Sequence, residues 1–260
     1  MSTVSTGQNR VLAGKRTLIT GASKGIGADI ARTFAEAGAT LIITGRDLDR
    51  LTQHAHQLRN DHGVHVTPLA VDLSAADAPD RLAREALAAY DGLDVLINNA
   101  GISYPEQVAD LSADHLDEVL NVNLRAPALL AARVGAAMAA AGSGSIITMA
   151  SAAGVRALAE HYVYCMTKAG LLMATKVLAL ELGPSGVRAN SICPTVTLTD
   201  MGQRVWLDNP DKATPMLERI PLRRFVYPSE VAQTALWLAS DASAMINGVD
   251  LPIDGGYLVS

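Results

Sequence analysis

Short apolar runs alternate with longer segments of helical periodicity along the chain from about residue 16 onward. Short apolar runs bounded by turn-forming residues predict buried strands, and apolar residues recurring every three or four positions predict helices. The predicted strands are Arg16–Thr20, Thr40–Thr44, His65–Ala70, Val95–Ile97, Ser145–Met149, Arg188–Cys193 and Gly248–Ile253. The predicted helices are one that ends at Ala37, then Leu48–Asp61, Ala76–Tyr90, Ser112–Ala141, one that carries Tyr164 and ends at Glu181, and Ser229–Ala239.

This alternation predicts an α/β fold with a doubly wound parallel sheet and helices on both faces. Right-handed crossovers predict the strand order 3-2-1-4-5-6-7. We expect residues 1–14 to be a flexible N-terminal tail and residues 15–260 to form a single domain. Residues 195–224 show little periodicity and contain several prolines, so they predict a mobile flap with short helices.

Composition and charge narrow the class of protein. Hydrophobic residues make up 49% of the chain and charged residues 18%, which argues against disorder. The net charge of -5 offers no basic face for nucleic acid. We expect no membrane span, because no apolar run reaches the length of one, and no signal peptide, because Met1–Arg10 is polar. Only Cys165 and Cys193 are present, which favours a reduced, cytoplasmic setting.

A glycine-rich turn follows the first predicted strand and opens the first predicted helix. Gly21, Gly25 and Gly27 have the spacing Gly-x-x-x-Gly-x-Gly. Glycines let the backbone approach a pyrophosphate closely, and a helix N-terminus supplies free N–H groups and a positive dipole end. The position of this turn therefore predicts a dinucleotide-binding, Rossmann-type domain.

The end of the second predicted strand bears on the choice of dinucleotide. Arg46 follows this strand, and Lys24 lies in the glycine turn. Two cations favour the 2′-phosphate of NADP(H), so we expect NADP(H) to be preferred while NAD(H) remains an alternative. Asp47 could contact a ribose hydroxyl instead, although we expect it to cap the following helix.

Tyr164 and Lys168 form the candidate catalytic pair. They are four residues apart and share one face of a helix, with Lys168 placed beside the Tyr164 phenol. A nearby cation lowers a phenol's pKa from ~10 and makes it a better acid or base near neutral pH. Ser151 ends a predicted strand thirteen residues before Tyr164, where its hydroxyl could meet a substrate oxygen.

Other polar residues follow the same logic. Asn99 and Gly101 come after the fourth predicted strand, where an asparagine can bridge strands and a glycine permits close approach to a ligand. Asn123 lies in the turn before Pro127, which is expected to bend its helix and free backbone carbonyls. Histidines at positions 54, 56, 62 and 65 do not align as ligands on one helical face, so we expect a solvated helix end and no metal site.

Together these motifs resemble the short-chain dehydrogenase/reductase family over nearly all of residues 13–258. The resemblance implies a catalytic tetrad of Asn123, Ser151, Tyr164 and Lys168. Tyr164 would be the acid/base, Ser151 would polarise the substrate oxygen, Lys168 would bind the nicotinamide ribose, and Asn123 would hold a relay water. The implied cofactor-binding residues are Gly21, Ser23, Lys24, Gly25, Ile26, Gly27, Arg46, Asp72, Leu73, Asn99, Ala100, Gly101, Tyr164, Lys168, Pro194, Val196, Thr197 and Thr199.

Within the family, the chain looks most like the branch of L-xylulose reductases and tetrameric carbonyl reductases. That branch implies reduction of ketoses and dicarbonyls or oxidation of acyclic polyols. It also implies a homotetramer, which the apolar helices Ser112–Ala141 and 162–182 favour as well. The implied substrate residues are Ser151, Ala153, His161, Tyr164, Thr195 and Trp206. Cys193-Pro194-Thr195 departs from the family's usual Asn-Pro-Gly.

Two other functions remain open from the sequence. One is a reductase of the same family acting on another substrate, such as a 3-oxoacyl thioester or a steroid. Arg156, His161 and Trp206 favour a polar substrate pocket over the apolar one that such substrates need. The other is a catalytically silent NAD(P)-binding regulator, which would predict loss of a tetrad residue.

Overall fold

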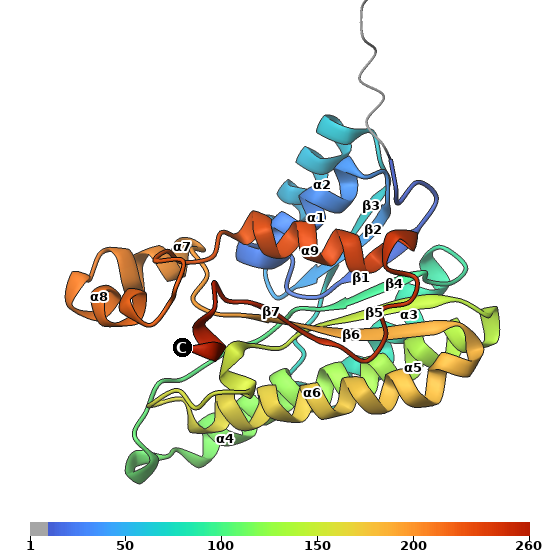
Figure 1. Cartoon of the computed structure of the whole chain (residues 1–260). Coiled ribbons are helices and arrows are strands. Elements are labelled where there is room, and N and C mark those ends of the chain that lie inside the picture. Colours follow the sequence, from blue (N-terminus) through green and yellow to red (C-terminus); the bar gives the residue numbers. More distant parts are fainter. Residues whose placement is uncertain (1–9) are drawn as a thin grey trace, which may run out of the picture.

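The computed structural model describes residues 10–260, and these contain one seven-stranded parallel sheet (Figure 1). Its order is β3-β2-β1-β4-β5-β6-β7, so the predicted fold class and strand order are confirmed. The strands are β1 (Arg16–Ile19), β2 (Thr40–Gly45), β3 (Val66–Ala70), β4 (Val95–Asn98), β5 (Gly144–Met149), β6 (Val187–Pro194) and β7 (Asp250–Ile253). Adjacent residues such as Ile42 and Ile43 are both fully buried, because helices cover both faces of the sheet.

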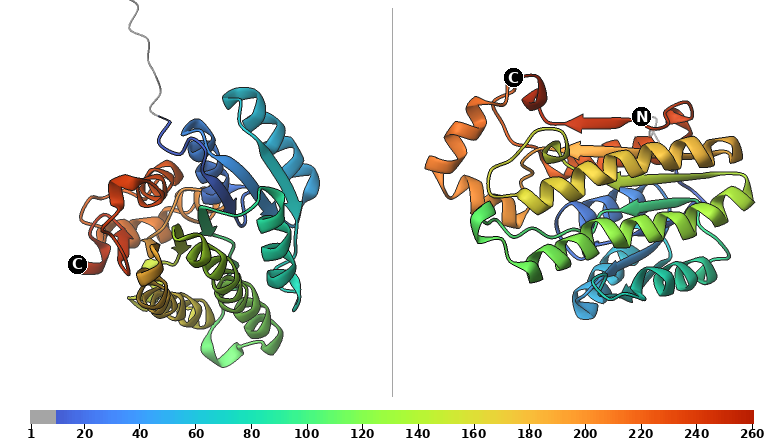
Figure 2. Two further views of the ribbon diagram at one scale, coloured as in Figure 1. Left: turned by 90° about the vertical axis from the view of Figure 1, so that its right-hand side faces the viewer. Right: turned by 90° about the horizontal axis from the view of Figure 1, so that it is seen from below.

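Helices form one layer on each face of the sheet. α1 (Gly25–Glu36), α2 (Leu48–His62) and α9 (Pro228–Ala239) pack on one face and share a core cluster with β1 and β2. The other face is covered by α3 (Ala78–Ala89), α5 (Ala126–Ala141) and α6 (Tyr162–Leu182). Two further views show α5 and α6 side by side along the sheet (Figure 2). Because all strands are parallel, their carboxyl ends lie at one edge of the sheet, where a ligand can reach several of them.

The long helix predicted for Ser112–Ala141 is divided by a π-helical segment. α4 (Ala113–Leu120) leads into this segment, η2 (Asn121–Arg125), and α5 follows. Pro127 lacks an N–H group, and the N–H of Ala126 bonds the carbonyl of Asn121 five residues back. The wide turn replaces the simple bend that we predicted at the proline.

The packed part of the chain begins before the predicted boundary at residue 15. Leu12 is fully buried in the core cluster beside α1, and its N–H bonds the carbonyl of Ala37. Residues 10–14 therefore do not behave as the predicted tail, and residues 1–9 lie outside the described part of the chain.

The predicted flap contains short helices and a small apolar cluster of its own. α7 (Asp200–Gly202), the π-helical segment η5 (Gln203–Leu207) and α8 (Pro210–Glu218) make up most of it. Its cluster contains Met216, Ile220 and Phe225, and extends to Ala152 and Tyr257. Because Ala152 directly follows Ser151, the flap is packed against the predicted catalytic loop.

Two helical stretches are long and apolar enough to cross a membrane, by length and composition alone. They are 113–141 and 162–185, so the prediction that no segment reaches this length is wrong. Both stretches lie along the sheet, and in each of them 39% of the most apolar 18-residue segment is buried. Core helices meet the same criterion, and the unburied remainder is apolar surface that a partner could cover.

An ion pair joins β1 and β4 at their amino ends, opposite the predicted site. The Arg16 side chain donates to both carboxylate oxygens of Asp94, from Nε at 2.8 Å and Nη2 at 3.1 Å. The backbone N–H of Arg16 donates to the same carboxylate at 2.7 Å. Asp94 thus receives three hydrogen bonds at the start of two central strands.

Candidate active site

Ser151, Tyr164 and Lys168 come together beyond the carboxyl end of β5. Ser151 follows this strand, and Tyr164 and Lys168 lie on the first two turns of α6. Lys168 is 4% exposed, and its Nζ lies 5.4 Å from the centre of the Tyr164 ring. The Ser151 hydroxyl is near enough to the Tyr164 phenol to lower its pKa, and it donates to the carbonyl of Pro194 at 3.4 Å. This cluster places a hydroxyl, a phenol and an ammonium group around one volume.

The predicted lowering of the Tyr164 pKa by Lys168 is not found in this structure. Burial raises the pKa of the Tyr164 phenol, and the nearby Ser151 hydroxyl offsets this only in part. The Lys168 ammonium lies over the ring and donates to the carbonyl of Met149 at 2.6 Å. Burial lowers the pKa of Lys168 itself to about 8. Desolvation therefore outweighs any effect of the cation on the phenol.

Asn123 is fully buried in the π-helical segment and holds the chain after β4. Its Oδ1 accepts from the N–H of Ile102, and its Nδ2 donates to the carbonyl of Ile102, both at 2.8 Å. A Cβ at Gly101 would lie 3.4 Å from Asn123 Oδ1 and 3.7 Å from Lys168 Nζ. The predicted tetrad residues Asn123 and Lys168 therefore both lie next to Gly101.

The glycine-rich turn forms a concave backbone segment, called the cradle below, that has no room for side chains at the glycine positions. Gly21 and Gly25 have φ values of +68° and +57°, which favour glycine. A Cβ at Gly27 would lie 2.3 Å from the carbonyl oxygen of Gly21 and 2.5 Å from Asn99 Nδ2. Asn99 fixes this turn by donating from Nδ2 to the carbonyls of Thr20 and Gly21.

The cradle fits a dinucleotide pyrophosphate. No side chain caps the N-terminus of α1, where the N-cap residue is Lys24, so free N–H groups face the turn. Thr199 lies opposite, because a Cβ at Gly25 would be 3.1 Å from its methyl group. The structure thus brings the predicted residues Gly25 and Thr199 to the two sides of one site.

Exposed charged side chains lie where the ribose and adenine would be expected. Arg46 is exposed after β2, and Asp72 follows β3. Hydrogen bonds from the Ser74 N–H and hydroxyl lower the pKa of the Asp72 carboxyl, with a smaller contribution from Arg46. Asp47 accepts from the N–H of Arg50 at 3.0 Å and so caps α2, as predicted. Its Oδ1 is thereby engaged by the helix.

His161, a predicted substrate residue, lies beside Tyr164. The two rings meet edge to face with centroids 6.0 Å apart. Nδ1 of His161 is 2.8 Å from the carbonyl oxygen of Ala159, which is an acceptor only, so in the neutral ring Nδ1 carries the proton. Nε2 is then an acceptor with a free lone pair.

The other predicted substrate residues, Ala153, Thr195 and Trp206, have different surroundings. Ala153 is buried beside Ser151 and donates its N–H to the Ser151 hydroxyl at 3.1 Å, while Thr195 donates its N–H to the carbonyl of Ile253. Trp206 belongs to the flap cluster, with its ring 5.9 Å from that of Phe225.

The side chain of Arg156, which we expected to favour a polar substrate pocket, is bound to the C-terminal end of the chain. It donates to the backbone carbonyls of Tyr257 at 2.7 Å and Ser260 at 3.0 Å, and it stacks on the Tyr257 ring. Sequence reasoning also missed the carbonyls of Ala159 and Pro194, which bond the side chains of His161 and Ser151. Residue identities carry no signal for backbone acceptors of this kind.

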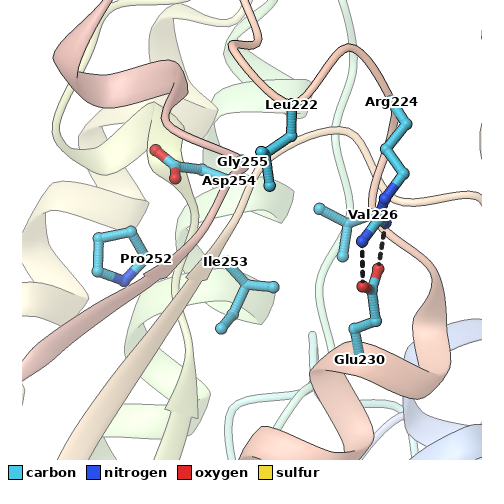
Figure 3. A pocket seen from close by; sticks show the side chains of 8 residues that line it. All are labelled: Leu222, Arg224, Val226, Glu230, Pro252, Ile253, Asp254 and Gly255. Carbon is cyan, nitrogen blue, oxygen red and sulfur yellow. Dashed lines mark hydrogen bonds and ion pairs between the residues drawn. The ribbon is translucent and has the colours of Figure 1, made fainter.

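A pocket of about 210 Å³ lies at the base of the flap (Figure 3). It is lined by the returning flap, the start of α9 and the end of β7, and Arg224 and Glu230 form a two-pronged ion pair across one side. The predicted site residues lie outside its lining. It is separate from the catalytic cluster and marks where the flap joins the domain.

Among the described residues, no group of three or more histidine, cysteine, aspartate or glutamate side chains could hold a metal ion. Both cysteines are free thiols. The arrangement is that of a proton-transfer site next to a dinucleotide cradle.

Comparison with known proteins decides the family. A protein-family model described as enoyl-(acyl carrier protein) reductase matches residues 21–258. The chain is 42% identical to a D-threitol dehydrogenase of Mycolicibacterium smegmatis, covering 95% of this chain and 94% of the relative. The chain belongs to the short-chain dehydrogenase/reductase family. This short-chain dehydrogenase/reductase is therefore an oxidoreductase that acts on CH–OH groups and uses NAD(P).

Other members of the short-chain dehydrogenase/reductase family are similar over the same length. The L-xylulose reductase of Bos taurus is 40% identical, covering 96% of this chain and 98% of the relative. An NAD-dependent glycerol dehydrogenase of Listeria innocua is 37% identical, covering 94% of both chains. A solved structure described as a putative NAD(P)-dependent gluconate 5-dehydrogenase of Beutenbergia cavernae, with bound NADP, has a TM-score of 0.91 and 34% identity, covering 97% of this chain and 100% of that one.

Proposed function

We propose that this short-chain dehydrogenase/reductase interconverts small acyclic polyols and their ketoses. The names of the relatives support this: D-threitol, L-xylulose and glycerol are all small polyhydroxy compounds. The observation that carries the proposal is the acceptor Nε2 of His161, held beside Tyr164 by the carbonyl of Ala159. A polyol has a second hydroxyl that can donate to this nitrogen, whereas a simple alcohol does not.

Each residue of the catalytic cluster has one task in this proposal. A bound NAD(P) would supply the hydride chemistry at the substrate carbon, and the chain's own residues bind and orient the substrate and move the proton at its oxygen. Tyr164 transfers the proton at the same substrate oxygen, and the Ser151 hydroxyl donates a hydrogen bond to it. Lys168 keeps a positive charge beside the phenol at neutral pH, because its pKa of about 8 lies above 7. Asn123 holds the chain at Ile102 so that Gly101 leaves room for the nicotinamide ribose.

Two alternatives are less well supported. An acyl thioester reductase would agree with the description of the matching family model, yet the three relatives reported above, each similar over at least 94% of this chain, are named for polyols or ketoses. A silent NAD(P)-binding regulator would have lost a catalytic residue, and all four predicted residues are present and brought together around Gly101 or Ser151.

A substrate panel tests the proposal. We expect turnover of acyclic polyols and ketoses of about four to six carbons. His161→Ala should raise KM for a polyol more than it lowers kcat, because it removes a contact made in both ground and transition states. Turnover of acyl thioesters or steroids, with none of any polyol or ketose, would refute the substrate class and leave the hydride chemistry intact.

We further propose a preference for NADP(H) over NAD(H). Arg46 is exposed at the end of β2 and electrostatically coupled to Asp72, while Asp47 is engaged as a helix cap. Arg46→Ala should weaken NADPH binding more than NADH binding, and Arg50→Ala, an exposed arginine on α2, serves as the matched control. Tighter binding of NADH than of NADPH by the unmodified protein would contradict the preference. One relative, the glycerol dehydrogenase of Listeria innocua, is NAD-dependent by name.

We also propose a homotetramer in the cytoplasm. Helix α6 exposes an apolar stripe that includes Met173 at 62% and Leu180 at 77% exposure. Such a surface on a helix is normally covered, and twofold packing of identical chains is the commonest means. The two free thiols favour a reducing compartment.

A further inference from the structure

Glu160, which precedes His161, has a backbone conformation that residues other than glycine rarely adopt. Its φ is +64°, and only Asp91 and Arg223 share a positive φ among the described non-glycine residues. A left-handed conformation outside glycine is unfavourable and persists where surrounding contacts impose it. Something must therefore hold Glu160 in place, immediately before the histidine that faces Tyr164.

The segment at Glu106 and Gln107 supplies those contacts. The N–H of Glu106 donates to the carbonyl of Glu160 at 2.8 Å, and Nε2 of Gln107 donates to the Glu160 carboxylate at 2.9 Å. Glu106 also forms an isolated parallel β-bridge with His161. Both the backbone and the side chain of Glu160 are thus tied to a segment more than fifty residues earlier in the sequence.

That segment is itself fixed to α4. The carboxylate of Glu106 lies 3.1 Å from Nδ1 of His115, and the His115 ring stacks on Tyr104 with centroids 4.1 Å apart. The Tyr104 hydroxyl donates to Glu118 at 2.7 Å. The loop between β4 and α4 therefore has a defined position from which it can orient the turn at Glu160.

We propose that Gln107 and Glu160 are positioning residues for His161 and so set the affinity for the polyol. They do not touch the substrate. Their hydrogen bond, with the bridge at Glu106, holds the turn in which the Ala159 carbonyl fixes the His161 tautomer and directs Nε2 toward the substrate. The inference rests on the proposed polyol function and deepens it.

A charge-swap experiment tests this role. Gln107→Glu places two carboxylates together and breaks the hydrogen bond, so KM for a polyol should rise roughly two- to fivefold, the size expected for an exposed charged contact. The double variant Gln107→Glu with Glu160→Gln restores the bond with donor and acceptor exchanged, and KM should return toward the original value. Gln233→Glu, an exposed glutamine on α9, is the matched control and should change nothing.

Two readouts separate positioning from a general structural effect. KM for a secondary alcohol without a second hydroxyl should not change, and in a His161→Ala background Gln107→Glu should have no further effect on polyol KM. An unchanged polyol KM in Gln107→Glu, an effect that persists without His161, or failure of the swap to restore KM would each overturn the inference.

The NMR signal of the His161 ring gives a readout that needs no substrate. The signal is assigned by its loss in His161→Ala, and it should shift in Gln107→Glu and return in the double variant. If this shift occurs but no polyol is turned over, the proposed substrate class fails and the positioning contact stands. If polyols are turned over but the ring signal does not respond, the positioning role fails alone.

Discussion

Tyr164 and Lys168 differ in pKa from what a helix-face argument predicts. Their spacing correctly places them on adjacent turns, but it says nothing about how far the surrounding fold removes the two groups from solvent. Because burial disfavours both the phenolate and the ammonium, the pKa of Tyr164 rises while that of Lys168 falls. A bound cofactor changes the surroundings of both groups, so the two pKa directions describe the protein before it binds.

Replacing Tyr164 by phenylalanine keeps the ring and removes the transferable proton. We expect turnover to fall by about 10²–10⁴, the usual contribution of a general acid or base, with cofactor affinity retained. Steady-state kinetics and a cofactor titration measure the two effects. Tyr162→Phe, on an exposed side chain of the same helix, is the control and should stay near normal. Near-normal turnover in Tyr164→Phe would remove the residue from its assigned role.

Lys168 should leave a signature in the pH dependence of stability. Its pKa of about 8 when folded lies below the ordinary 10.5, so the unfolded chain binds more protons between these values. Unfolding free energy should therefore gain up to about 3 kcal/mol as the pH rises through this window. In Lys168→Met this gain should disappear. Denaturant titrations of both proteins without cofactor measure the difference, and parallel pH curves would contradict the pKa.

At the scale of elements, the sequence predicts most strands to within one or two residues. β1 was expected at Arg16–Thr20 and is found at Arg16–Ile19, because runs buried on both faces have sharp polar ends. The π-helical segment at Asn121–Arg125 could not be predicted. Residue identities do not show which backbone carbonyls are bound by tertiary neighbours; Asn98, for example, donates to the carbonyl of Pro127 in the first turn of α5.

The flap illustrates why site residues far from regular elements are harder to predict. Trp206 was expected over the substrate from its place in the sequence, and the structure includes it in the cluster with Phe225. Arg156 was expected near the substrate and instead binds backbone carbonyls near residue 260. In both cases local spacing does not encode the tertiary partner that the long side chain contacts.

Helix α6 provides a prediction about assembly. Met173→Glu combined with Leu180→Glu places charges on its apolar stripe, where burial in an interface would cost several kcal/mol. We expect the tetramer to dissociate, as measured by light scattering at micromolar concentration. Leu48→Glu, on an apolar side chain of α2 that is 50% exposed, is the control. A monomeric unmodified protein would contradict the proposed assembly directly.

At the scale of the whole molecule, the two ends of the sheet hold different kinds of residue. The predicted catalytic and cofactor residues lie beyond the carboxyl ends of the strands, whereas the Arg16–Asp94 pair joins the amino ends of β1 and β4. Burial opposes ionisation of the Asp94 carboxyl, but the hydrogen bonds from Arg16 outweigh it and hold its pKa below the usual value.

Asp94→Asn should therefore lower stability and leave catalysis unchanged. Removing a hydrogen-bonded charge should reduce unfolding free energy by about 1–3 kcal/mol at pH 7. The contribution is present above the unfolded pKa near 3.8 and is lost as the pH falls through the lower folded value, so the two proteins should converge in acid. Asp77→Asn breaks an exposed pair with Arg81 and should cost less. A large fall in kcat for Asp94→Asn would contradict the separation.

This separation bears on how the enzyme can change over evolutionary time. The Arg16–Asp94 ion pair lies at the amino ends of the strands, away from the loops at their carboxyl ends. Loops that follow the strands can vary in length and sequence without disturbing it. A laboratory library confined to residues 101–112, 152–161 and 195–224 should thus yield many folded proteins with altered substrate range, whereas the same mutational load placed on the opposite turns should yield mainly proteins that fail to fold.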